Sequence, residues 1–548
     1  MRWPAFLWLM LLPIVTSPVV YIIGRVLQRS LEGGAARGGI PTARLRRASA
    51  KPWASNPVRW LSLIVLLAAV WPFILAWHDL SQGTVARFTY GVISLRFDGI
   101  SLLLAAAVLL LGIIVSLFSG PYIGREAGQE KYHALLNTML GAMIGLGCAA
   151  DLFNLWVWFE TAAVASYMLV SYHSQEPSSL EAGVKYLVQN SVGSMLVLVG
   201  IGLVFAQVGT LDLSALKSLV QEMTHGGRPL LASLSPAALG LPGFADRFPL
   251  LVAGALFCVG FGVKIAIVPM HTWLPDAHSQ APSGISAILS GVVIETGLVA
   301  LLRALSVVSG TSLGWGPLLL AFGCINMLVG NLLALRQTQV KRLLAFSSLS
   351  HVGYMLLGLG TAITFGQLGG ARGGFFHLLT HTVMKGLAFL AAGSFLFVLR
   401  ISRGAHGPLM TEDLAGAARR YPLAALAFSV ALLGLGGLPP FAGFMSKWQI
   451  FAAGFQTGNA LMAAVVVFAL LNSLLSFAYY APLVNIMYRR TPTAVVVSGA
   501  PMPAPMTISL VILVLLVLAF GVWPSLANGL TVPAARAMLG LFGSAGGT

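Results

Sequence analysis

Long runs of hydrophobic residues follow one another along the whole chain, separated by short polar segments. Each run is about 20 residues long, which is the length that a helix needs to cross a hydrocarbon core of roughly 30 Å. Because the bilayer interior offers no water to unpaired backbone groups, a spanning segment must be a helix or part of a closed barrel. Barrel strands would alternate polar and apolar positions over about 10 residues, and these runs do not. The pattern therefore predicts an all-α integral membrane protein.

The hydropathy pattern predicts about 14 transmembrane helices. Their approximate limits are 5–27, 58–79, 98–118, 134–152, 154–172, 184–207, 249–270, 283–306, 314–335, 341–362, 374–399, 421–455 (interrupted), 460–488 and 505–527. We expect the first run to be retained as a helix, because it lacks the basic start and the small-residue cleavage site of a signal peptide.

Two of the predicted helices carry a proline break close to a lysine. The first run reaches Lys264 and then Pro269, and the second reaches Pro439-Pro440 and then Lys447. Broken helices at corresponding places in two halves are the sequence sign of a transport site built from inverted repeats. With five spans in each half, an odd number, the two halves would have to lie in opposite orientations across the membrane.

This reading divides the chain into four parts. We expect N-terminal helices with a basic cytoplasmic loop over 1–133, a first repeat over 134–306 and a second repeat over 314–488. A last transmembrane helix and a tail occupy 489–548.

The composition supports the membrane reading. Of the 548 residues, 57% are hydrophobic and 9% charged, whereas a soluble domain needs roughly 25% charged residues to cover its surface. The net charge of +16 raises the option of a nucleic-acid partner, but the basic residues lie in short loops between apolar runs. We therefore expect a lipid bilayer as the surroundings and no nucleic acid.

The basic residues also predict an orientation. One set of alternate loops holds the larger share of them, including Arg29, Arg37, Arg44, Arg46, Arg47, Lys51, Arg125, Lys131, Arg336, Lys341 and Arg342. Because basic loops stay in the cytoplasm, we expect a bacterial-type inner membrane with both termini on the outer side. An even number of helices agrees.

Redox chemistry and metal binding are not expected in this chain. Its three cysteines, Cys148, Cys258 and Cys324, lie far apart in apolar runs and form no CxxC pair. They can hold no iron–sulfur cluster, and no glycine-rich dinucleotide loop follows a strand. We expect no cofactor, no catalytic redox site and no metal, so any NADH or quinone chemistry would belong to partner subunits.

Five ionisable residues fall in the middle of predicted spans: Glu160, Lys264, Glu295, Lys385 and Lys447. Each costs about 2.5–3.5 kcal/mol near the bilayer centre on insertion scales. Such residues are paired, neutralised or facing water, and they mark ion pathways. A Glu160–Lys264 pair would act as a switch if an arriving proton breaks it. Structural ion pairs are the alternative.

Histidines accompany this set in the second half. His377, His381 and Lys385 are spaced four residues apart and share one helical face, and His351 lies on the preceding span. Imidazoles pass protons well near neutral pH. A metal site and core histidines bonded to backbone are the alternatives.

A polar group follows the Pro269 break. His271, Asp276 and His278 are candidates for a gate through which protons arrive from the cytoplasm, and Trp273 fits an interfacial anchor equally well.

These residues carry a family resemblance. The stretches 269–282 (PMHTWLPDAHSQAP) and 285–291 (ISAILSG) resemble the signature of the antiporter-like membrane subunits of respiratory complex I, the Mrp cation/proton antiporters and the membrane-bound hydrogenases. The stretch 346–354 (FSSLSHVGY), the His377–Lys385 helix and 437–444 (GLPPFAGF) match it too. The resemblance covers roughly 90–490, and the stretches 151–167 and 183–211 look closest to the Mrp D-type and complex I N- and M-type subunits.

The resemblance implies a fold of 14 transmembrane helices with two inverted five-helix repeats, in which the seventh and twelfth helices are broken. It implies Glu160 and Lys264 as the first-half pair and Lys447 as the terminal residue of the second half. A hydrophilic axis would connect them through His351, His377, His381 and Lys385.

One position departs from the family pattern. The eighth helix of the family carries lysine within Ser-Gly-x-x-x-Lys-x-Gly, whereas this chain has Glu295 there. The charge at the relay between the halves is reversed. We expect Glu295 to pair with Lys264 or Lys385, or to help hold a cation.

Three functions compete at this point. The first is a subunit that translocates protons or Na⁺ within a complex of other membrane and soluble subunits, such as the proton-pumping part of an NADH:quinone oxidoreductase-type translocase or an Mrp-like antiporter. The second is the membrane partner of a carbonic-anhydrase-like protein in energy-coupled inorganic-carbon uptake. The third is a structural membrane subunit without transport, against which the retained charged axis argues.

Overall fold

A computed structural model describes residues 4–37, 57–91, 93–124, 126–226, 244–311, 314–404 and 407–543. The prediction of an all-α integral membrane protein is confirmed. In the described ranges, 11 helices are long and apolar enough to cross a membrane. Arg44, Arg46, Arg47, Lys51 and Arg125, which contribute to the predicted orientation, lie outside the described residues.

The first half of the chain forms α1 (Ala5–Arg37), α3 (Pro57–Ser81), α4 (Gly99–Tyr122), α5 (Gln129–Cys148), α6 (Leu152–Val170), α7 (Pro177–Val208), α8 (Leu213–Gly226), α9 (Phe244–Ile265), α10 (Trp273–Gln280), α11 (Ser283–Ile288), a π-helical turn (Leu289–Val293) and α12 (Ile294–Val307). The second half forms α13 (Trp315–Ala334), α14 (Val340–Phe365), α15 (Leu368–Leu399), α16 (Ala417–Arg420), α17 (Pro422–Gly436), α18 (Ala442–Phe455), α19 (Ala460–Arg489), α20 (Ala494–Val497), α21 (Ala504–Val522) and α22 (Asn528–Phe542). Short 3₁₀ turns cover Ser309–Thr311, Ile401–Arg403, Thr411–Leu414 and Pro524–Ala527.

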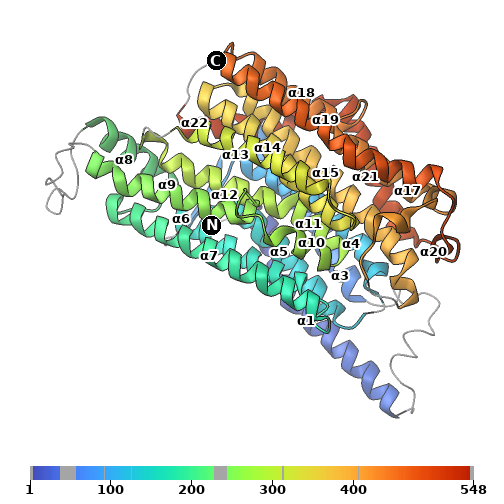
Figure 1. Ribbon diagram of the computed structural model, residues 1–548. Coiled ribbons are helices and arrows are strands. Elements are labelled where there is room, and N and C mark those ends of the chain that lie inside the picture. Colours follow the sequence, from blue (N-terminus) through green and yellow to red (C-terminus); the bar gives the residue numbers. More distant parts are fainter. Residues whose placement is uncertain are drawn as a thin grey trace.

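The helices run side by side in one bundle (Figure 1). The teal and green helices α6, α7 and α9 form one flank, and the orange α18 and α19 form the opposite flank. Between the flanks, α12 packs against α9, and α15 packs against α11, α14 and α18. The most deeply buried helices, which are the segment 283–307, α14 and α15, therefore lie where the two halves of the chain meet.

Both predicted helix breaks are present. The first helix stops at Ile265, where Ala266 has a positive φ of 60°, and the chain becomes helical again at Trp273. The second stops at Gly436, where Gly437 has a φ of 91°, a conformation that glycine adopts without steric cost. A helix end leaves its last carbonyls without helical partners, and each break brings such carbonyls into the protein interior.

A third interruption has no counterpart in the sequence analysis. The segment 283–307 is one apolar run, but the π-helical turn Leu289–Val293 divides it just before Glu295. Such turns occur within helices and often at functional sites. The turn contains Gly291 but no proline.

Two short strands lie outside the predicted all-helical pattern. β1 (Ala86–Tyr90) and β2 (Ile93–Phe97) pair antiparallel, with Ala86 opposite Phe97. Leu95 and Phe97 are buried, as the period-2 alternation of a strand with one covered face requires. This hairpin joins α3 to α4, and Leu95 also bridges to Ala149 after α5.

The predicted C-terminal tail is largely helical. α22 packs against α4 and α15, so closely that a Cβ atom on Gly99 would lie 2.1 Å from the carbonyl carbon of Pro533. Glycine at the start of α4 therefore allows α22 to join the bundle.

Candidate ion-translocation site

Lys264 lies in the last turn of α9, immediately before the first helix break, and is only 2% exposed. Its ammonium group donates to the Tyr186 hydroxyl at 2.7 Å and lies 3.4 Å from the Ser166 hydroxyl. The rings of Phe159, Tyr167 and Tyr186 surround it at 4.9–5.8 Å. Aromatic faces and hydroxyls therefore hold this buried cation.

Glu160 does not form the expected direct pair with Lys264. Among the described residues, no carboxylate lies within the 4.0 Å of an ion pair with Lys264. Glu160 is half-buried on the side of α6 that also exposes Val157 and Val164, and its buried Oε1 has no hydrogen-bond partner there. It still acts electrostatically on Lys264. The expected contact is wrong because the Lys264 ammonium is hydrogen-bonded to Tyr186 and Ser166 instead.

Glu295, in the first turn of α12, makes different contacts from those expected. Its Oε1 lies 2.9 Å from Nδ1 of His381, and its Oε2 accepts a 2.7 Å hydrogen bond from the Thr382 hydroxyl. Glu295 and His381 are both fully buried. The expected ion pair with Lys264 or Lys385 is wrong, since His381 and Thr382 take both carboxylate oxygens.

Three histidines continue from Glu295 into the second half. The rings of His381 and His351 lie 5.3 Å apart. His351 and His377 are stacked, with Nδ1 of the first 3.1 Å from Nε2 of the second. Nδ1 of His377 then lies 2.8 Å from the Ser446 hydroxyl. The sequence placed these histidines on two neighbouring helices, and the structure brings them into one file.

Lys447 follows Ser446 on α18 and is held at the second helix break. Its ammonium donates to the carbonyls of Leu435 and Gly436 at 2.9 and 3.3 Å and to Ser473 at 2.9 Å. A cation is favoured at the carbonyl end of a helix dipole, and α17 ends at Gly436. The break thus provides the binding place for this lysine. We name the series from Glu295 through His381, His351 and His377 to Lys447 the buried row.

Lys385 lies one turn beyond His381 on α15 and is fully buried. Its ammonium donates to the Leu344 carbonyl at 2.8 Å and to the Ser347 hydroxyl. It therefore joins the buried row from the side, against α14.

The residues expected to form a gate separate into two environments. Asp276 is half-buried and pairs with Lys185 at 3.2 Å and Arg342 at 2.8 Å. His278 is fully buried and stacked on Phe389. These contacts fix α10 between α7 and α14.

Two further residues of the segment 269–278 lie on the flanks of α10. His271 is half-buried, edge-on to Phe346. Trp273 is 1% exposed, stacked on Tyr186 at 4.1 Å and bonded to the Val263 carbonyl. The interfacial role considered for Trp273 is wrong, because the helix break turns this side chain into the core.

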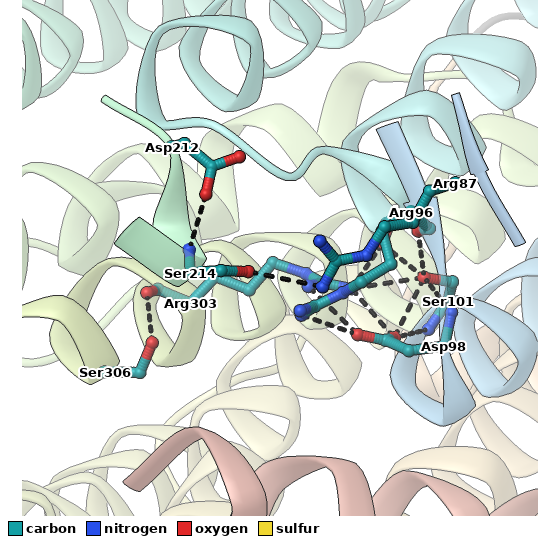
Figure 2. Close-up of polar contacts among 9 residues, drawn as sticks. Arg87, Arg96, Asp98, Ser101, Asp212, Ser214, Arg303 and Ser306 are labelled. Carbon is teal, nitrogen blue, oxygen red and sulfur yellow. Dashed lines mark hydrogen bonds and ion pairs between the residues drawn. The ribbon is translucent and has the colours of Figure 1, made fainter. Parts of the chain in front are cut away.

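The sequence analysis missed one buried ion pair (Figure 2). Arg303 of α12 is fully buried and places its two terminal nitrogens 3.2 and 3.0 Å from the two carboxylate oxygens of Asp98. It also donates to the Gly147 carbonyl at 2.6 Å, and Arg96 contacts Asp98 at 2.9 Å. Burial alone would raise the pKa of Asp98, but Arg303 and Arg96 outweigh it and lower this pKa to about 2. The visible signal was an arginine inside the apolar run 283–306.

No group of three or more histidine, cysteine or acidic side chains suited to a metal ion occurs in the part of the chain that the structure describes. The buried row combines one carboxyl group, three imidazoles and one lysine, and Lys385 joins it from the side. This set of groups is suited to moving protons.

Comparisons with known proteins identify the family of this chain. The family described as NADH:quinone oxidoreductase/Mrp antiporter, transmembrane, matches residues 149–476. The F420H2 dehydrogenase subunit N of Methanosarcina mazei is 30% identical over 89% of this chain and 94% of its own length. NADH-quinone oxidoreductase subunit N 1 of Sorangium cellulosum is 34% identical over 81% of this chain and 84% of its own.

Solved structures match over almost the whole chain. A chain of an archaeal membrane-bound sulfane sulfur reductase shares 25% identity with a TM-score of 0.79, over 99% of this chain and 100% of that one. A chain of respiratory complex I from Thermus thermophilus shares 26% identity with a TM-score of 0.70, over 96% of this chain and 99% of that one. A chain of the Mrp complex of Dietzia has the same fold at 21% identity and a TM-score of 0.73, over 98% of this chain and 99% of that one. The chain is a member of the NADH:quinone oxidoreductase/Mrp antiporter transmembrane family.

Proposed function

We propose that this chain moves protons through the membrane interior by way of Lys264 and the buried row from Glu295 to Lys447. The family makes the chain an ion-translocating membrane subunit of an energy-converting complex. The proposal adds the ion and the residues that carry it.

One observation carries the proposal: the contact of Glu295 with His381 at 2.9 Å continues as a file of imidazoles to Ser446 beside Lys447. An imidazole accepts a proton on one nitrogen and releases one from the other, near neutral pH. Glu295 supplies the negative charge that stabilises a protonated His381. The row therefore provides successive proton sites between the two halves.

Lys264 and Glu160 form the first-half part of the same path. In this state Tyr186 and Ser166 hold the lysine, and Glu160 has an unpaired buried oxygen. A shift of the Lys264 side chain toward Glu160 would exchange the hydroxyl contact for an ion pair. We propose this exchange as the switch that admits a proton to the row.

α12 connects the first-half lysine to Glu295. A Cβ atom on Gly297 would lie 3.3 Å from both Cβ and Cγ of Lys264, so the glycine lets α12 approach the lysine closely. Glu295 lies on the same helix two residues earlier. A movement of Lys264 is thereby coupled mechanically to the start of the row.

The complex contains other subunits, as the solved relatives are multi-subunit respiratory and Mrp complexes. We propose an inner-membrane location with both termini on the outer side, following the basic loops, and two inverted repeats over 134–306 and 314–488. Na⁺ is the alternative cargo. His271, Asp276 and His278 are proposed to lie where protons arrive from the cytoplasm.

Interrupting the row at its centre tests the function. The intact complex, purified with its partners, is placed in vesicles that contain a pH-sensitive dye. Flux is started by the complex's own driving reaction, or by an imposed sodium gradient where no redox subunit copurifies. His351→Gln should lower proton flux about 100-fold or more, while His78→Gln, at an exposed histidine outside the row, should leave it unchanged. Equal flux in both variants would refute the proposed path.

A further inference from the structure

Lys341 is the second residue of α14. Its position between two apolar runs predicts a residue of a basic loop, but its side chain is buried. It is only 3% exposed. Its ammonium donates to the Ala281 carbonyl and lies 3.5 Å from the Ser279 carbonyl, at the C-terminal end of α10. The nearby carboxylate of Asp276 is occupied by Arg342 and Lys185. Among the described residues, Lys341 has no ion-pair partner.

His278 of α10 is the next ionisable group inward. It is fully buried, and its ring lies on Phe389 with centroids 4.8 Å apart. Within the described ranges, neither ring nitrogen has a hydrogen-bond partner. Buried nitrogens without hydrogen-bond partners destabilise a fold, so their presence here calls for a reason. Lys341 and Lys385 are the charged groups that act on this imidazole.

Lys385 links this pair to the buried row. It lies one turn from Phe389 and one turn from His381 on α15, and it binds the carbonyl of Leu344, which lies one turn from Lys341 on α14. Lys341, His278 and Lys385 thus form a series that begins beside the ion-paired surface of α10 and ends against His381.

We propose that Lys341, His278 and Lys385 form a proton-uptake branch that loads the buried row at His381. The proposal rests on the proposed function of that row. A proton leaves the Lys341 ammonium for one free nitrogen of His278, and the proton of the opposite nitrogen passes to the neutral amine of Lys385. Lys385 then protonates His381, and Lys341 is reprotonated from the cytoplasmic side.

The charges favour such transfer. Among the described residues, Lys341, His278 and Lys385 have no carboxylate partner, so burial and mutual repulsion prevent all three from being charged together. At least one site is therefore vacant, and a proton can move into it. The free nitrogens of His278 provide both the accepting and the releasing position.

The simpler reading is that Lys341 only caps the carbonyl end of α10. Arginine separates the two roles: it keeps the positive charge and the donors, but it does not release its proton in proteins. Lys341→Arg therefore preserves a cap and removes a relay.

The test measures initial proton flux of the intact complex in vesicles between about pH 6 and 8, across the range in which imidazoles titrate. Lys341→Arg should lower the flux about tenfold or more, with a deficit that grows as pH rises because external protons become scarcer. Lys131→Arg, at an exposed lysine of α5, should match the unmodified complex. His278→Phe keeps a ring on Phe389 and removes both nitrogens, so it should show the same loss of flux. This variant provides the test if the Lys341→Arg complex does not assemble.

Two results overturn the proposal in different ways. In the first, His351→Gln abolishes flux while Lys341→Arg and His278→Phe leave it unchanged at every pH. This result would refute the uptake branch but not the proposed function of the buried row. In the second, His351→Gln also leaves the flux unchanged. This result would refute the proposed function of the buried row, and with it the uptake branch.

Discussion

The carboxylate of Glu295 contacts His381 directly: Oε1 lies 2.9 Å from Nδ1, and both side chains are fully buried. The family resemblance places a lysine at this position of the eighth helix. The carboxyl group contacts His381 and Thr382 where a lysine would be a second cation near Lys385. An imidazolium at His381 is thereby stabilised where a lysine would repel it.

Glu295→Lys restores the residue that the family pattern expects and should impair this protein. The Glu295 carboxyl contacts both His381 and the Thr382 hydroxyl. A lysine ammonium at this position could accept a hydrogen bond from neither. We expect proton flux to fall about tenfold or more with normal assembly. Proton flux and its sodium dependence are the quantities to measure, and no change in either would make Glu295 a neutral exchange.

Glu160→Gln and Lys264→Ala test the first-half switch. Each should abolish coupled flux while the protein stays in the membrane, because the exchange of Lys264 between Tyr186 and Glu160 needs both charges. Membrane content by immunoblot controls for folding. If both variants keep full coupled flux, the proposed switch is wrong.

The Arg303–Asp98 pair should contribute strongly to stability. Asp98→Leu leaves a fully buried guanidinium without its carboxylate, and breaking a buried pair costs about 3–5 kcal/mol. Thermal unfolding in detergent should show the loss. The double variant Asp98→Leu with Arg303→Met should regain most of it, since the fully buried guanidinium is removed together with its partner and only the partly exposed Arg96 keeps its charge, and a double variant as unstable as the single one would argue against this account.

Acid should remove the same contribution. The pKa of Asp98 is lowered to about 2 in the folded protein, from about 3.9 in an unfolded chain. A depressed carboxyl pKa stabilises the fold above the unfolded value, and this contribution, about 2–3 kcal/mol, is lost as pH falls from about 4 to 2. The stability gap between the unmodified protein and Asp98→Asn, measured by unfolding at successive pH values, should narrow over that interval. A gap independent of pH would contradict the ion pair.

The sequence predicted those features that hydrophobic length and proline determine. The apolar runs located the 11 helices of the described ranges that are long and apolar enough to cross a membrane, and Pro269 and Pro439-Pro440 marked both breaks near Lys264 and Lys447. These signals are local, because helix length and the missing proline N–H act on the segment that contains them.

Contacts between distant segments could not be read in the same way. Glu295 meets His381 only because α12 and α15 pack together, and Tyr186 displaces Glu160 as the partner of Lys264. Lys341 looked like a loop residue because its burial depends on the carbonyls of α10. The hairpin before α4 was overlooked because its short alternating strands lie between longer apolar runs.

The central claim is that protons pass through Glu295 to the histidines, and proton flux in Glu295→Gln tests it most directly. Glutamine keeps the size of the side chain and one acceptor oxygen, but its amide nitrogen only donates and it cannot carry the charge. Glu412→Gln, at an exposed carboxylate paired with Arg490, is the matched control. We predict flux lowered by about 100-fold in Glu295→Gln and unchanged in Glu412→Gln, with both complexes assembled. Full flux in the assembled Glu295→Gln complex would show that protons take another path.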